Sequence, residues 1–105
     1  MRYLGNAFSI QMLPVTGSLV SVEPVEPDVV ASELSSGFTS CIGHLDTANV
    51  VSSLLGLEVQ MNRINVSLKP EDTLFVAQIT GGRLPEGSTT LPDGVKILFF
   101  KVRLV

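Results

Sequence analysis

Phe38-Thr39-Ser40-Cys41-Ile42-Gly43, with the helix-like segment that follows it as far as Gly56, decides the fold of this chain. Residues 38–43 alternate as a β-strand does. The next segment predicts a helix, because Thr47 or Asp46 can cap it and Gly56 suits the left-handed position that ends a helix. Its expected buried stripe consists of Val50, Val51, Leu54 and Leu55.

The sequence on both sides of this stretch also predicts a mixture of helices and strands. A short helix is expected over residues 8–13, with Asn6 or Ser9 as its cap and Pro14 as its end, and another begins at Pro27 or Asp28. Residues 23–27 read as a polar connection, and residues 80–94 as a long, shaped loop. Strands are expected over residues 3–6, 17–22, 65–68, 73–79 and 95–105, the last of them central in its sheet.

This pattern predicts an α/β or α+β fold, with a small mixed β-sheet flanked by helices. The 105 residues suffice for a single domain, residues 1–105. A net charge of −3 argues against binding to long DNA or RNA. We expect no membrane span, because no apolar run approaches ~20 residues. One cysteine cannot form an internal disulfide, which favours a cytoplasmic location.

His44 is the only histidine of the chain, and it lies in Gly43-His44-Leu45-Asp46-Thr47, where the strand gives way to the helix. Imidazole has an ordinary pKa near 6.5 and can act as an acid or a base at neutral pH. The simpler alternative is a structural histidine that donates to a backbone carbonyl. Cys41 offers neither a credible thiol nucleophile with His44 nor a zinc site, since zinc needs three or four ligands.

Other polar residues are weaker signals when each is taken alone. Residues 82–89 have the glycine spacing of a P-loop, but a serine replaces the lysine and no helix signal follows. Arg63, Arg83 and Glu86 are each typical of a solvated surface. Gln78 ends an apolar strand, where a buried amide would need hydrogen-bond partners.

Five blocks stand in order along the chain: Asn6-Ala7-Phe8-Ser9-Ile10-Gln11-Met12-Leu13, Gly43-His44-Leu45-Asp46-Thr47, Asn62-Arg63, Gln78 and Arg83-Leu84-Pro85-Glu86-Gly87. Together these blocks resemble a known family, the archaeal-virus and bacterial ring nucleases known as type III anti-CRISPR proteins. The resemblance implies a small homodimer that binds cyclic tetra-adenylate and cleaves it without a metal or other cofactor, switching off type III CRISPR signalling.

The same resemblance implies a role for each residue of the site. The ribose 2′-OH would attack the phosphorus, and the product would be linear di-adenylate with a 2′,3′-cyclic phosphate. His44 would be the general acid, and Glu86 would orient the ribose or tune His44. Phosphates would be held by Arg63 and Arg83, and the remaining ligand contacts would come from Asn6, Ser9 and Gln78.

Two other interpretations remain open. The interval from Gln78 to Arg83 is longer than is usual in that family, which motivates a module that binds or sequesters a cyclic oligoadenylate without cutting it. The apolar run Ile97-Leu98-Phe99-Phe100-Lys101-Val102 motivates a structural protein whose sheet packs against a partner.

Overall fold

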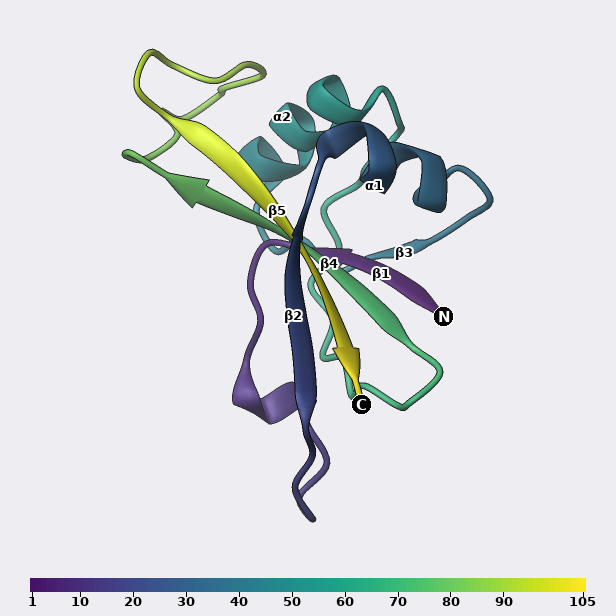
Figure 1. Cartoon of the computed structure of the whole chain (residues 1–105). Coiled ribbons are helices and arrows are strands. Elements are labelled where there is room, and N and C mark those ends of the chain that lie inside the picture. The colour runs from purple at the N-terminus through teal and green to yellow at the C-terminus, as the bar shows by residue number, and fades with distance from the viewer.

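A five-stranded mixed sheet with the strand order β2-β5-β4-β1-β3 forms the centre of the computed structural model, which describes residues 1–105 (Figure 1). β1 pairs in parallel with both β3 and β4, whereas β5 is antiparallel to β4 and β2. The expected α+β fold with a small mixed sheet is therefore confirmed. In chain order the elements are β1 (Arg2–Gly5), the 3-10 turn η1 (Ile10–Met12), β2 (Val20–Val25), α1 (Pro27–Leu34), β3 (Thr39–Ser40), α2 (Leu45–Leu55), β4 (Thr73–Thr80) and β5 (Lys96–Leu104).

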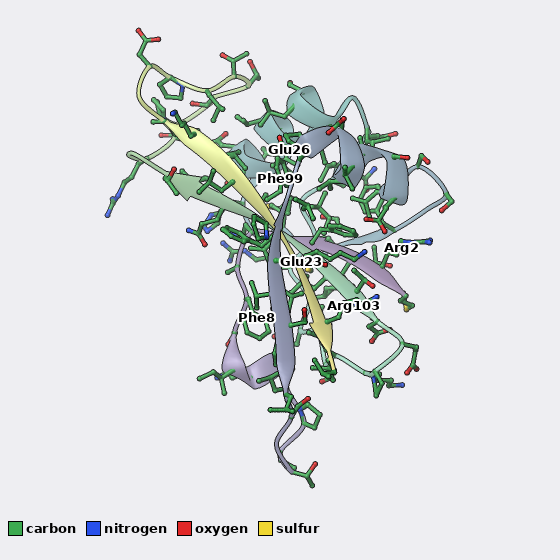
Figure 2. The ribbon with its side chains drawn as sticks, in the orientation of Figure 1. Arg2, Phe8, Glu23, Glu26, Phe99 and Arg103 are labelled. Atoms are coloured by element: carbon green, nitrogen blue, oxygen red, sulfur yellow. The ribbon has the colours of Figure 1, made fainter.

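Helices α1 and α2 cover one face of the sheet (Figure 1). The larger hydrophobic cluster lies between them and the strands, and Phe99 of β5 points into it (Figure 2). Three members of the predicted α2 stripe are buried, but Leu54 is 43% exposed. β4 is buried on both faces from Leu74 to Ala77, which explains its unbroken apolar run.

Segments without regular pairing cover part of the opposite face. Residues 6–14 and 61–69 lie over it, and a hydrogen bond of 2.8 Å from Leu68 N to the Met12 carbonyl joins the two segments. A second hydrophobic cluster lies on this face and consists of Val66, Leu68, Leu74, Val76 and Val102. Phe8, on the segment between β1 and η1, packs against it (Figure 2). The cover stops before the carboxyl end of β4, where Gln78 and its β5 partner Leu98 are both exposed.

Two predicted elements are wrong on this face. Residues 65–68 form no strand; Val66 and Leu68 point inward and cover the sheet instead of extending it. A strand that extends the sheet and a segment that covers its face show the same alternation of apolar residues, so the local pattern could not distinguish them. The helix expected over residues 8–13 is only the single turn η1, which Ser9 caps by accepting a hydrogen bond from Gln11 N.

Three boundaries also differ from the prediction. β2 starts at Val20 and continues through the expected connection, because an edge strand tolerates a proline such as Pro24. The strand expected over residues 38–43 pairs only at Thr39–Ser40. His44, rather than Thr47 or Asp46, caps α2. β5 lies between β2 and β4, as expected, so its apolar run is explained by the sheet itself.

The structure contains no helix with the length and the apolar character that a membrane crossing requires.

Candidate functional site

The parallel strands β1, β3 and β4 all end at the same edge of the sheet. Asn6 directly follows β1, Gly43 and His44 come shortly after β3, and Gln78 is near the end of β4. In sheets with parallel strands, ligands bind outside the carboxyl ends of those strands. The topology therefore gathers four of the residues that the sequence singled out.

Gly43 is held from both sides at this edge. Its N–H donates to Asn6 Oδ1 at 3.2 Å, and its carbonyl accepts from Arg63 Nε at 2.8 Å. Both backbone polar groups of the residue before His44 are thus fixed. Because Arg63 uses only Nε here, its two Nη groups are available to an anion.

His44 begins α2 as its N-cap, with φ −129° and ψ 131°. Its carbonyl accepts from Ala48 N at 3.0 Å, but its exposed imidazole makes no hydrogen bond in the structure. The structural histidine bound to a backbone carbonyl is therefore not observed. The imidazole stands beside the amino end of a helix, where the helix dipole and unpaired N–H groups favour anions.

Two adjoining depressions lie on the sheet face beside this edge. They share Ile64 and Asn65. The first, of about 320 Å³, is lined by Asn6, Cys41, Gly43, Arg63, Ile64 and Asn65. The second, of about 340 Å³, is lined by Ser9, Gln11, Met12, Ile64, Asn65, Val66 and Ser67. The structure therefore places Ser9 next to the cleft that contains Asn6 and Arg63.

Cys41 lies against the wall of the first depression and is not suited to nucleophilic chemistry. Burial raises the pKa of its thiol, which keeps the sulfur protonated at neutral pH. Its Sγ is so close to Gly5 that a Cβ at that glycine would lie 2.8 Å away.

Nowhere in the structure do three or more histidine, cysteine, aspartate or glutamate side chains gather as a metal site would require.

Arg83 and Glu86 lie on the loop between β4 and β5, and neither side chain makes a hydrogen bond or an ion pair. The structure therefore does not bring them into contact with the cleft. Residues 82–89 contain a turn at Glu86-Gly87, and no helix follows them before β5. The same loop contacts α2 through Asp46, which sequence reasoning treated only as a helix cap.

Lys96 is a second residue that sequence reasoning missed. The register pairs Thr80 with Lys96 and Gln78 with Leu98, so Lys96 and Gln78 project from the same face of the sheet. Both are exposed. The alternation along residues 95–105 puts Lys96 on the same face as Leu98. Only the pairing with β4 shows which face of the sheet that is.

Other cations lie away from this edge. Lys101 is paired with Glu33 of α1 at 3.1 Å on the helix-covered side. Arg2 and Arg103 lie toward the opposite end of the sheet from the loop between β4 and β5 (Figure 2). The positive charge nearest the carboxyl edge belongs to Arg63 at the cleft, with Arg83 on the loop between β4 and β5 and Lys96 at the start of β5.

These features define a small α+β domain with a polar, partly cationic cleft at the carboxyl ends of its parallel strands. A family model described as STIV B116-like matches residues 2–96, and the chain belongs to this family. B116 of Sulfolobus turreted icosahedral virus has a similar solved structure, with a TM-score of 0.81, 28% sequence identity and 97% of each chain covered. Protein ORF116 of Acidianus filamentous virus 1 is 30% identical over 98 residues, which span 92% of this chain and 84% of ORF116.

Proposed function

We propose that this protein is a metal-independent ring nuclease that cleaves cyclic tetra-adenylate and so switches off type III CRISPR signalling in the host cytoplasm. One observation carries the proposal. Asn6 and Arg63 hold Gly43 from both sides beside one cleft, so a guanidinium is fixed next to the residue that precedes the lone histidine at the amino end of α2. This is a suitable combination for binding a phosphodiester and protonating its leaving group.

The chemistry needs little from the protein, because RNA carries its own nucleophile. The ribose 2′-oxygen forms a bond to the adjacent phosphorus and gives up its proton to solvent. The bond from phosphorus to the 5′-oxygen breaks, and the imidazolium of His44 protonates that oxygen as it leaves. Protonation of this kind contributes ~10²–10⁴-fold to the rate. Two cuts give two di-adenylates, each with a 2′,3′-cyclic phosphate.

The polar groups left free at the cleft match such a ligand. Asn6 uses its carbonyl oxygen on Gly43, so its amide N–H groups remain available to a phosphate. The Nη groups of Arg63 match phosphate oxygens with their forked geometry, and the guanidinium of Arg83 would do the same where the loop between β4 and β5 meets the ligand. Ser9, on the second depression, and Gln78, near the end of β4, would contact bases or sugars. Glu86 would orient the reacting ribose or tune His44.

We propose a homodimer as the active form. Part of the sheet face beside the cleft is uncovered, with Leu98 47% exposed opposite Gln78 and Val22 55% exposed farther along the sheet on β2. A second copy would cover these apolar side chains and bring a second Arg63 and Arg83 to the same ligand. A cyclic tetranucleotide can be two-fold symmetric, so it fits a site on the two-fold axis of a dimer.

The test is incubation of the purified protein with cyclic tetra-adenylate in EDTA, followed by chromatography of the nucleotides. We expect the wild type to convert the ring into linear fragments. His44→Ala should cut at least ~100-fold more slowly, since it removes the general acid, while its Kd for the ring changes by only a few fold.

Equal cleavage rates for the wild type and the His44 variant would overturn the role of His44. An intact ring that stays bound to the wild type would instead support the module that sequesters cyclic oligoadenylate. An intact ring that does not bind would exclude both functions.

A further inference from the structure

The loop between β4 and β5, residues 81–95, positions Glu86 at the corner of a turn. Ser88 N–H donates to the Pro85 carbonyl at 3.1 Å, and Gly87 has a φ of +81°. This is the geometry of a type II turn, with Glu86 at its first central position. The backbone of Glu86 is therefore fixed relative to Gly87, and whatever holds Gly87 also places Glu86.

Two side chains of α2 form hydrogen bonds with the backbone of this loop. Asp46 Oδ2 accepts a hydrogen bond of 3.2 Å from Gly87 N, and the Ser53 hydroxyl donates to the Thr89 carbonyl at 3.1 Å. Asp46 and Ser53 are seven residues apart, so they lie on the same face of the helix. Asp46 is also two residues after His44, in the first turn of the same helix.

We propose that Asp46 is a positioning residue, which locks the turn carrying Glu86 at a fixed place relative to His44. This inference rests on the proposed ring-nuclease function. A long loop that is free at its tip samples many positions, and its side chains then meet the substrate only part of the time. Tying the tip to the helix that begins at His44 restricts this freedom, which raises the rate of the chemical step.

The acceptor is a side chain and the donor is a main-chain N–H. The contact can therefore be removed at Asp46 without any change in the loop sequence. Asp46→Ala removes the acceptor, whereas Asp46→Asn keeps a carbonyl oxygen that can still accept from Gly87 N. Asp28→Ala is the matched control, because Asp28 is the first-turn acid of α1 and contacts only the adjacent Val29 N.

The first readout uses the free protein and needs no nucleotide. Hydrogen exchange of the Gly87 amide, followed by nuclear magnetic resonance, should be about tenfold faster in Asp46→Ala than in the wild type. The amide of Val51, inside α2, should be unchanged in every variant. Asp28→Ala should leave Gly87 as it is in the wild type, and Asp46→Asn should recover most of the protection. Unchanged exchange at Gly87 in Asp46→Ala would overturn the proposal, whatever the protein does to its ligand.

The second readout is the single-turnover cleavage rate of cyclic tetra-adenylate. We expect Asp46→Ala to cut about tenfold more slowly with a Kd within threefold of wild type, and Asp46→Asn to retain most of the rate. A faster Gly87 exchange with an unchanged cleavage rate would overturn the positioning role. If the wild type leaves the ring intact, the proposed function fails and this role fails with it. The exchange data then decide only whether Asp46 fixes the loop.

Discussion

Gly81→Ala is the substitution whose effect follows most directly from the structure. Gly81 and Gly94 approach each other at the neck of the loop between β4 and β5, and a Cβ at Gly81 would lie 2.1 Å from the Gly94 carbonyl oxygen. Real Cβ contacts essentially never fall below 3.0 Å, so the neck must open by about 1 Å. Gly81 also has a φ of +83°, which costs an alanine about 1–2 kcal/mol.

The control is Gly94→Ala. Gly94 has a φ of +81°, and a Cβ added there would have nothing within 4 Å. Both variants suffer the backbone strain, but only Gly81→Ala must displace the neck, which costs about a further 1–3 kcal/mol. Urea unfolding followed by circular dichroism measures the two losses. We expect Gly81→Ala to lose the larger free energy of unfolding and to cut cyclic tetra-adenylate more slowly, since its loop carries Arg83 and Glu86. Equal losses in the two variants would refute the close approach at the neck.

Three further predictions concern the core and the buried polar groups. Phe75→Ala should lower the free energy of unfolding by about 3–5 kcal/mol, because Phe75 is fully buried, whereas Val15→Ala, at a fully exposed side chain, should cost under about 1 kcal/mol. Asp72→Asn should cost about 1–3 kcal/mol in the same urea assay, since this carboxylate pairs with the N-terminal ammonium at 3.0 Å and accepts from Lys69 N; a milder loss than at the exposed Asp93 would contradict this. Because burial raises the pKa of the Cys41 thiol, the folded state holds that proton more tightly. Stability should therefore fall as the pH rises past the ordinary pKa of a thiol, an effect that Cys41→Ala should lose in pH-dependent unfolding.

The regular elements with strong periodicity could be predicted from the sequence. α2 has a clear apolar stripe, and Gly56 ends it in the left-handed conformation, with a φ of +66°, as predicted. β4 and β5 also lie where their apolar runs indicated. These elements depend on local spacing, which the sequence displays directly.

Elements whose structure depends on contacts with distant residues of the chain could not be predicted in the same way. Residues 65–68 have the alternation of a strand, but they pack over one face of the sheet and cover it instead of joining its edge. The cap of α2 fell on His44 because the chain turns from β3 into the helix at that point. Residue preference favoured Asp46 or Thr47, but tertiary geometry set the boundary.

The candidate site shows the same division. The resemblance supplied the residues Asn6, His44 and Arg63, and the parallel pairing of β1 with β3 explains why the backbones of Asn6 and His44 converge. The two bonds on Gly43 depend on contacts across at least 20 residues, which no local pattern encodes. Asp46 and Lys96 were missed because each acts through a neighbour from a distant part of the chain.

The mass of the cleavage products tests the central claim most directly. Attack by the ribose 2′-OH adds no water, so each di-adenylate with a 2′,3′-cyclic phosphate has half the mass of the ring. We predict these fragments when the wild-type protein is incubated with cyclic tetra-adenylate in EDTA. Initial fragments heavier by one water molecule per cut would show direct hydrolysis and contradict the mechanism. A ring that remains uncut would contradict the ring-nuclease function itself.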